Sequence, residues 1–138
     1  MSAGRYDLFA YGSLQLSRIM QVATGRLFEC EPALLRGYAR YALRGETYPG
    51  IVEDVGNSTD GVLWRDLDDA TLTCLDTFEG SWYRRDEVTV IVGDESIPAV
   101  TYVLVSEQQH RVSRRRWSLK RFETRCLQRF LRDNAAHL

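Results

Sequence analysis

A glutamate occupies the last turn of a predicted helix, a position where helices disfavour negative charge. Residues 66–79 are expected to be helical because apolar side chains recur on one face, at positions 72, 75 and 78. Gly80 suits the position that ends such a helix. The negative end of the helix dipole then faces Glu79, which together with burial would raise the pKa of its carboxyl group. A carboxyl group tuned toward neutral pH can accept a proton and return it, as a general acid/base does.

An ordinary structural role for Glu79 is the alternative. Arg84 and Arg85 follow shortly after it, and a glutamate commonly forms an ion pair with such neighbours or is simply exposed. Asp76, about one turn earlier, adds a like charge. The helix by itself therefore leaves both a catalytic and a structural Glu79 open.

A second chemically suggestive stretch is the turn Tyr11-Gly12-Ser13-Leu14, between an apolar strand and a helical stripe. A turn at such a junction leaves several backbone N–H groups without a partner, so they can bind an anion. The turn lacks the GxxxxGK[ST] spacing of phosphate loops and the GxGxxG spacing of dinucleotide sites. A small carboxylate or an oxyanion is the expected ligand, and a plain connection between strand and helix is the alternative.

Strands must position these residues. Short runs rich in apolar and β-branched residues, separated by turn residues, predict five to seven strands, the clearest at 6–11, 32–43, 88–92 and 97–105. Gly37 interrupts the second run, as at a bulge or a barrel bend. With only three convincing helices, this pattern favours an antiparallel or mixed sheet over alternating βαβ units, and the fold class is α+β.

Composition limits the class of protein. The chain has 138 residues, 44% of them hydrophobic and 27% charged, which suits a single domain over residues 1–138. No stretch approaches the ~18 apolar residues of a membrane span, and the first residues lack a secretory pattern, so a cytoplasmic protein without a membrane partner is expected. Three widely spaced cysteines argue against a disulfide framework or a zinc site and are expected to be buried, reduced thiols.

Positive charge gathers at the C-terminal end. Nine of the 18 Lys and Arg residues lie in residues 111–138, beside only two acids. A helix over about 118–133 explains most of this, because its apolar residues form one stripe and its basic residues lie largely off it. A helix docked on the core with a solvated basic face is therefore expected. Nucleic-acid binding is unlikely, since the basic residues are not interleaved with aromatic ones. The role of the arginine-rich segment 111–116 stays open.

Four motifs in order carry a family resemblance. They read Leu8-Phe9-Ala10-Tyr11-Gly12-Ser13-Leu14, Tyr48-Pro49-Gly50-Ile51-Val52, Leu75-Asp76-Thr77-Phe78-Glu79-Gly80 followed by Tyr83-Arg84-Arg85, and Ala99-Val100-Thr101-Tyr102-Val103. Together, from residue 6 to about residue 105, they resemble the γ-glutamylcyclotransferase-like superfamily, in the AIG2-like branch that includes γ-glutamylamine cyclotransferase. The resemblance implies a small mixed, largely antiparallel β-barrel flanked by helices.

The resemblance also implies an activity and a site. Enzymes of this family cyclise a γ-glutamyl group to 5-oxoproline and release the attached amine, without a metal or an organic cofactor. Glu79 matches the family's catalytic acid/base, the turn Tyr11-Gly12-Ser13-Leu14 its substrate-binding loop, and Tyr83 an aromatic residue that helps to close the cavity. Tyr48 is a further substrate-binding candidate, although Tyr48-Pro49-Gly50 is more often a turn than part of a site. The expected partner is a small γ-glutamyl substrate.

Two other functions stay open at this stage. The same fold can serve as a non-catalytic small-molecule binding or regulatory module, because fold alone does not fix function. Retention of Glu79 favours the enzyme, since a mere binder of a γ-glutamyl carboxylate gains nothing from a second anion. A Ser13–His nucleophilic pair is disfavoured, because His110 and His137 fall in a loop and in the terminal tail. Tyr102, within an apolar strand, is expected to belong to the core.

Overall fold

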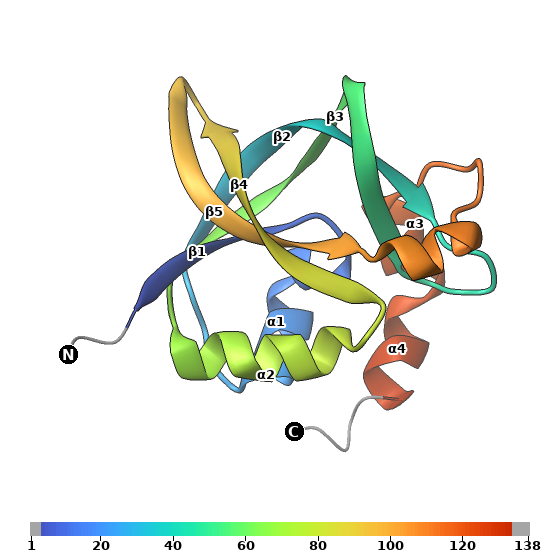
Figure 1. Cartoon of the computed structure of the whole chain (residues 1–138). Coiled ribbons are helices and arrows are strands. Elements are labelled where there is room, and N and C mark those ends of the chain that lie inside the picture. The colour runs from blue at the N-terminus through green and yellow to red at the C-terminus, as the bar shows by residue number, and fades with distance from the viewer. Residues whose placement is uncertain (1–3, 134–138) are drawn as a thin grey trace.

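Five strands close into a barrel in the computed structural model, which describes residues 4–133 (Figure 1). Their order around the barrel is β1-β3-β2-β4-β5. The strands are β1 (Arg5–Ala10), β2 (Cys30–Ala42), β3 (Pro49–Asp68), β4 (Tyr83–Val92) and β5 (Glu95–Leu104). β1 pairs with β5 in parallel and every other pair is antiparallel, which confirms the predicted mixed, largely antiparallel barrel.

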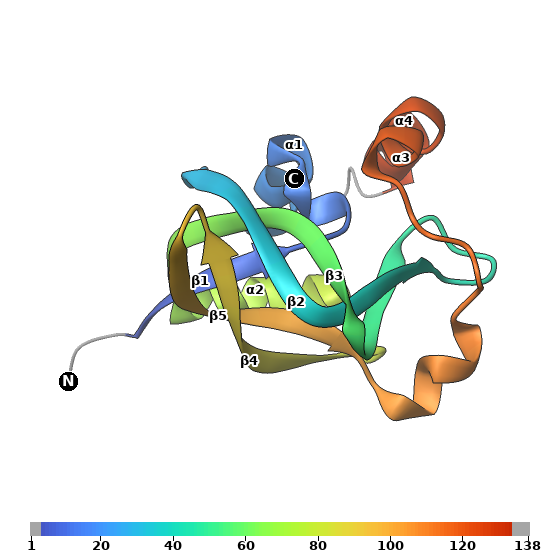
Figure 2. The same ribbon diagram turned by 90° about the horizontal axis from the view of Figure 1, so that it is seen from above.

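The β2–β3 hairpin, which is made of the two longest strands, runs along the barrel (Figure 2). The sequence predicted short strands, and for β3 this was wrong, because it runs unbroken over 20 residues. The register between β2 and β3 shifts between Arg36 and Tyr38, where Gly37 has a φ of 86°. The predicted bulge at Gly37 is therefore confirmed, and it bends the hairpin so that the sheet can close.

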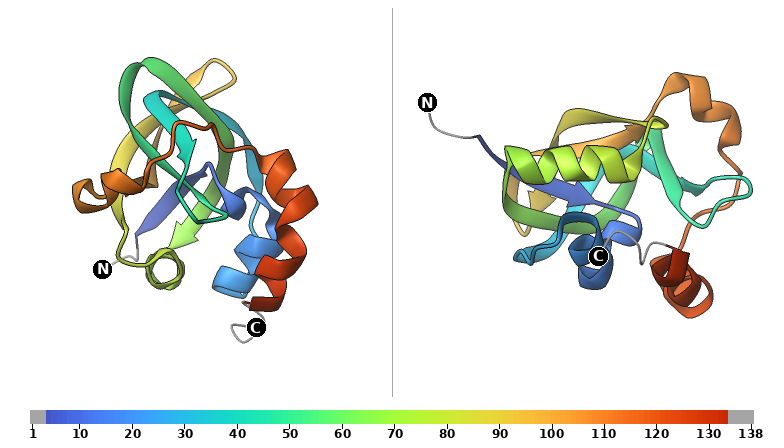
Figure 3. Two further views of the ribbon diagram at one scale, coloured as in Figure 1. Left: turned by 90° about the vertical axis from the view of Figure 1, so that its right-hand side faces the viewer. Right: turned by 90° about the horizontal axis from the view of Figure 1, so that it is seen from below.

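Helices cover one side of this barrel (Figure 3). They are α1 (Ser17–Thr24), α2 (Asp69–Glu79), α3 (Leu119–Arg125) and α4 (Leu127–Asp133), with 3-10 helices at Ser13–Gln15 and Ser106–Arg111. Successive side chains of β1 point to opposite faces of the sheet and so belong to two apolar layers. Leu8 packs with the helices, whereas Phe9 packs with residues from the other strands. In residues 4–133, no helix is long and apolar enough to cross a membrane.

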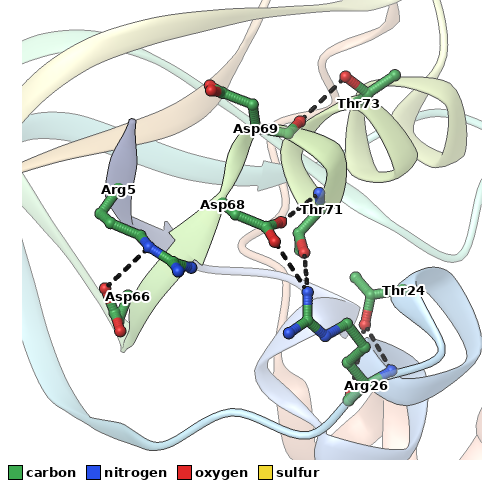
Figure 4. Close-up of polar contacts among 8 residues, drawn as sticks. All are labelled: Arg5, Thr24, Arg26, Asp66, Asp68, Asp69, Thr71 and Thr73. Carbon is green, nitrogen blue, oxygen red and sulfur yellow. Dashed lines mark hydrogen bonds and ion pairs between the residues drawn. The ribbon is translucent and has the colours of Figure 1, made fainter. Parts of the chain in front are cut away.

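Polar contacts fix the start of α2 (Figure 4). The side chain of Asp68 accepts a hydrogen bond from the Thr71 backbone N–H at 2.8 Å, so Asp68 caps the helix and Asp66 lies outside it. Arg26, just after α1, donates to the same carboxylate at 3.0 Å. Hydrogen bonds from Thr71, and a further one from the Arg26 guanidinium group, hold the pKa of Asp68 well below its usual range. At the other end, Gly80 has a φ of 81° and ends the helix as predicted, so Glu79 is its last residue.

The basic C-terminal helix predicted over about 118–133 is two helices, with a break at Cys126. In a straight helix, Phe122 and Phe130 would lie about 12 Å apart along the axis. Their ring centroids are 5.7 Å apart, so the break allows both rings to pack together on the barrel. The prediction that the apolar stripe docks on the core is confirmed.

The prediction that the cysteines are buried was wrong for two of them. The side chains of Cys30 and Cys74 are exposed, because both lie at outward-facing positions.

Candidate active site

Two connected hollows meet at the C-terminal end of α2. The outer one has a volume of about 560 Å³ and the inner one about 30 Å³, room for a group of the size of one or two water molecules. Residues that line both are Ser13, Tyr48, Glu79 and Tyr83. Tyr11, Gly12 and Leu14 line the inner one. The structure therefore brings all seven residues predicted for the site around one place.

Glu79 is half-buried, and none of the charged side chains in the described part of the chain pairs with it. Burial raises the pKa of its carboxyl group to about 7. The ion pairs considered from the sequence do not form: Arg84 binds Asp86 at 2.8 Å and Arg85 binds Asp76 at 2.9 Å. Within residues 4–133, no hydrogen bond or ion pair joins the Glu79 carboxylate. The geometry thus leaves a carboxyl group free to exchange a proton with a molecule in the cavity.

Four tyrosines surround this carboxyl group. Burial raises the pKa of the phenols of Tyr11, Tyr83 and Tyr102 well above the ordinary value, and that of Tyr48 to about 12. Neighbouring carboxylates add to this effect: Glu79 for Tyr11, Asp76 for Tyr102 and Glu46 for Tyr48. Three phenols are fixed by hydrogen bonds: Tyr11 donates to the Tyr102 carbonyl at 2.5 Å, Tyr83 donates to the Pro49 carbonyl at 2.7 Å, and Tyr102 donates to Asp76 at 2.7 Å. The four phenols therefore stay neutral near pH 7 and line the site with hydroxyl groups.

The predicted binding loop presents its backbone in one orientation because each of its carbonyl groups has a donor. Arg40 donates to the Tyr11 carbonyl at 2.8 Å, and the indole of Trp64 donates to the Leu14 carbonyl at 2.9 Å. The Gly12 and Ser13 carbonyls accept from the backbone N–H groups of residues 15 and 16. In contrast, the N–H groups of residues 12–14 form no hydrogen bond with any described residue. They are available to an anion in the inner hollow.

Gly12 is needed for space. Its φ is −116°, which does not require glycine. A Cβ atom at this position would instead lie 3.0 Å from two carbon atoms of the Pro49 ring. The glycine therefore lets the loop approach the start of β3, where Tyr48 and Pro49 line the inner hollow.

Replacing Gly12 with valine should displace the loop and weaken ligand binding more than folding, because the branched side chain collides with Pro49. We expect a purified variant to unfold cooperatively, yet to bind 5-oxoproline at least tenfold more weakly than the parent by calorimetry, the loss that follows from one disturbed hydrogen bond to a charged group. If the folded Gly12→Val protein binds 5-oxoproline as tightly as the parent, the loop only connects the strand to the helix and does not bind the ligand.

Sequence analysis missed three contributors to the site. Tyr102 is buried as predicted for a core residue, but it also lines the inner hollow. Arg40 reaches the loop from β2, and no local pattern distinguishes it from other strand arginines. The third is α4, from which Arg129 and Phe130 line the outer hollow. Among residues 4–133, no three His, Cys, Asp or Glu side chains gather into a group that could hold a metal ion.

Known proteins are similar to this chain in sequence. A family model described as gamma-glutamyl cyclotransferase, AIG2-like, matches residues 8–119, which is further than the resemblance to about residue 105. AIG2-like protein C of Arabidopsis thaliana is 37% identical over 100 residues, which make up 71% of this chain and 58% of that protein. A second relative from the same plant, Protein AIG2 C, is 34% identical over 109 residues, 78% of this chain and 66% of its own.

Solved structures agree in fold. The solution structure of an Arabidopsis thaliana protein superposes with a TM-score of 0.74 at 28% identity, over 99% of this chain and 84% of that one. A structure described as gamma-glutamyl cyclotransferase gives a TM-score of 0.66 at 22% identity, over 74% and 68% of the two chains. The match covers less than two thirds of the length of the two curated relatives, 58% and 66%.

Proposed function

The chain belongs to the AIG2-like γ-glutamyl cyclotransferase family, and on that premise we propose that it is an enzyme that converts γ-glutamyl amines or γ-glutamyl amino acids to 5-oxoproline, with Glu79 as the general acid/base. The observation that carries the proposal is the half-buried Glu79 carboxyl group, which has a raised pKa and lies where the two hollows meet. Burying a carboxyl group without a partner costs the fold stability, so its presence in a cavity favours a functional role over a structural one.

The reaction needs one proton carrier. The substrate's α-ammonium group becomes a nucleophile when Glu79 takes a proton from it. The resulting amine attacks the γ-carbonyl carbon, a C–N bond forms and closes a five-membered ring, and the original amide C–N bond breaks. Glu79 returns that proton to the departing nitrogen, and the ring nitrogen gives up its second proton to the released amine. The products are therefore 5-oxoproline and the amine in its ammonium form, and the proton count balances. Because nucleophile and electrophile belong to one molecule, the enzyme has mainly to hold a folded conformer.

The loop and the tyrosines complete the proposed mechanism. The free N–H groups of residues 12–14 can bind negatively charged oxygen of the substrate, either the α-carboxylate or the γ-carbonyl oxygen as it gains charge. The hydroxyl group of Tyr48, on the wall shared by both hollows, supplies a neutral donor without adding charge beside Glu79. The Tyr83 hydroxyl group on the same wall donates its hydrogen to the Pro49 carbonyl and offers the substrate an acceptor. The wider outer hollow leaves room for the departing amine.

A panel of γ-glutamyl compounds tests the proposal. Purified protein is incubated with γ-glutamyl amines and with γ-glutamyl amino acids, and 5-oxoproline is measured by chromatography. We expect release from at least one class. If compounds bind, as measured by calorimetry, but no 5-oxoproline forms, the chain is the non-catalytic binding module that the sequence left open.

The pH dependence of turnover should reflect the raised pKa. Only the ionised carboxylate can take the first proton, so kcat/KM should fall about tenfold per pH unit below pH about 7. An exposed glutamate would place this decline near 4.5, its ordinary value. Values of kcat/KM measured between pH 5 and 8.5, at constant ionic strength, distinguish a buried from an exposed Glu79. A kcat/KM that does not change down to pH 6 would exclude Glu79 as the base.

A further inference from the structure

Arg40, on β2, lies against the binding loop and takes part in none of the proton transfers proposed above. We propose that Arg40 is a positioning residue, whose guanidinium group fixes the direction of the Gly12 N–H group toward the ligand. The expected effect of Arg40 on turnover rests on the proposed function. The expected effect of Arg40 on the orientation of the loop does not.

The guanidinium group is held from three sides. Nη1 donates to the Tyr11 carbonyl at 2.8 Å and to the Asp60 carbonyl at 2.9 Å, and Nη2 donates to the Asp60 carboxylate at 2.7 Å. The ring of Trp117 lies 5.6 Å from Cζ, as in a cation–π contact. The Arg40 side chain is 15% exposed, whereas that of Asp60 is 80% exposed. Arg40 therefore faces inward to the loop in a fixed orientation.

Peptide geometry links this contact to the ligand side of the loop. The Tyr11 carbonyl and the Gly12 N–H belong to the same planar, trans peptide group, so they point in opposite directions. Fixing the carbonyl toward Arg40 therefore fixes the N–H away from Arg40. That N–H has no partner among the described residues, and Gly12 lines the inner hollow. Without Arg40, the Tyr11–Gly12 peptide could rotate and turn this donor away.

Arg40 differs from the other groups that hold the loop. The Gly12 carbonyl accepts from Gln15, through both its backbone and its side-chain amide, and the Ser13 carbonyl accepts from the Leu16 backbone. These donors are local and neutral. The Trp64 indole, which donates to the Leu14 carbonyl, is distant in sequence but also neutral. Arg40 is charged, and a charged donor forms a stronger bond and polarises the peptide that it binds. The Gly12 N–H should thus be a better donor to an anion than an ordinary amide.

Two Arg40 variants and one matched control test the inference. Arg40→Met removes every donor and keeps side-chain length, and Arg40→Lys keeps the charge but loses the planar fork that reaches both partners. Arg65→Met is the control, because Arg65 is also a partly exposed strand arginine with ion pairs, to Asp7 at 3.7 Å and Glu31 at 3.3 Å. Within residues 4–133, no hydrogen bond or ion pair joins Arg65 to the loop.

Two readouts are measured for each variant, well below its unfolding temperature. One is kcat/KM for 5-oxoproline release, and the other is the Gly12 amide resonance by NMR, with and without 5-oxoproline as the probe. We expect Arg40→Met to lose roughly 10- to 100-fold in kcat/KM, the range for a lost hydrogen bond to a charged group, and to shift the Gly12 amide resonance. Arg40→Lys should recover part of both, and Arg65→Met should change neither.

The outcomes separate this inference from the proposed function. If the parent releases no 5-oxoproline, the proposed function fails, and the Gly12 resonance still decides whether Arg40 positions the loop. An Arg40→Met protein with parental kcat/KM and a parental Gly12 resonance overturns the inference. Should Arg40→Met not fold, Arg40→Lys decides in the same way: a partial loss with a shifted resonance supports positioning, and parental values for both contradict it.

Discussion

Replacing Glu79 with glutamine is expected to lower the turnover of γ-glutamyl substrates at least about 100-fold while the fold persists, because a removed general acid/base typically costs 10²–10⁴-fold. Glutamine matches glutamate in size and cannot carry the proton. Steady-state rates of 5-oxoproline formation at pH 8, compared with the parent at equal concentration of folded protein, measure the effect.

Stability provides the control for this variant. Because the pKa of Glu79 is higher in the folded protein than the ordinary value, its ionisation opposes folding as the pH rises through about 7. Glutamine removes that cost, so the variant should unfold at the same temperature as the parent or higher at pH 8. An inactive variant that is also less stable would point to a structural Glu79, and a variant with near-parental turnover would remove Glu79 from the mechanism.

Replacing Phe122 with alanine should cost about 3–5 kcal/mol of unfolding free energy, the range for a fully buried phenylalanine. The Phe122 side chain is 2% exposed, and its ring centroid lies 5.9 Å from that of Trp117 and 5.7 Å from that of Phe130. Urea unfolding at pH 7 measures the loss directly. Because Trp117 also contacts Arg40, the packing of α3 supports the same arginine that holds the binding loop.

The matched control changes charge on the same helix. Arg121 and Arg125 are exposed, and within residues 4–133 neither side chain forms an ion pair. Replacing both with glutamine should change the unfolding free energy by less than about 1 kcal/mol. A Phe122→Ala protein as stable as this control would contradict the docking of α3 on the core.

Local sequence was enough to predict the two central parts of the site. The position of Glu79 follows from signals within α2, the apolar stripe and Gly80, which act over a few residues. The Tyr11–Leu14 turn is likewise local, since an apolar strand ends there and a helix begins soon after. Their meeting in space came from the family resemblance, because no local rule joins residues about 65 positions apart.

Other parts depend on long-range pairing that the sequence does not encode locally. Arg40 reaches Tyr11 and Asp60 only because β2 and β3 pair in one register, which shifts at the Gly37 bulge. The position of α4 depends on the break at Cys126, where the helical periodicity continues without a glycine or proline. Packing of the two phenylalanine rings, and not local propensity, determines that break.

A carbon-13 NMR titration of the Glu79 side-chain carboxyl group tests the central claim most directly, because it reports on the proton carrier without requiring a known substrate. Selectively labelled protein is titrated between pH 4 and 9, and the Glu79 resonance is identified by its absence from Glu79→Gln. A midpoint near 7, the value to which burial raises this pKa, is the predicted result. A midpoint close to the ordinary 4.5 would mean that Glu79 is fully ionised and solvated at neutral pH, and would contradict its role as an acid/base.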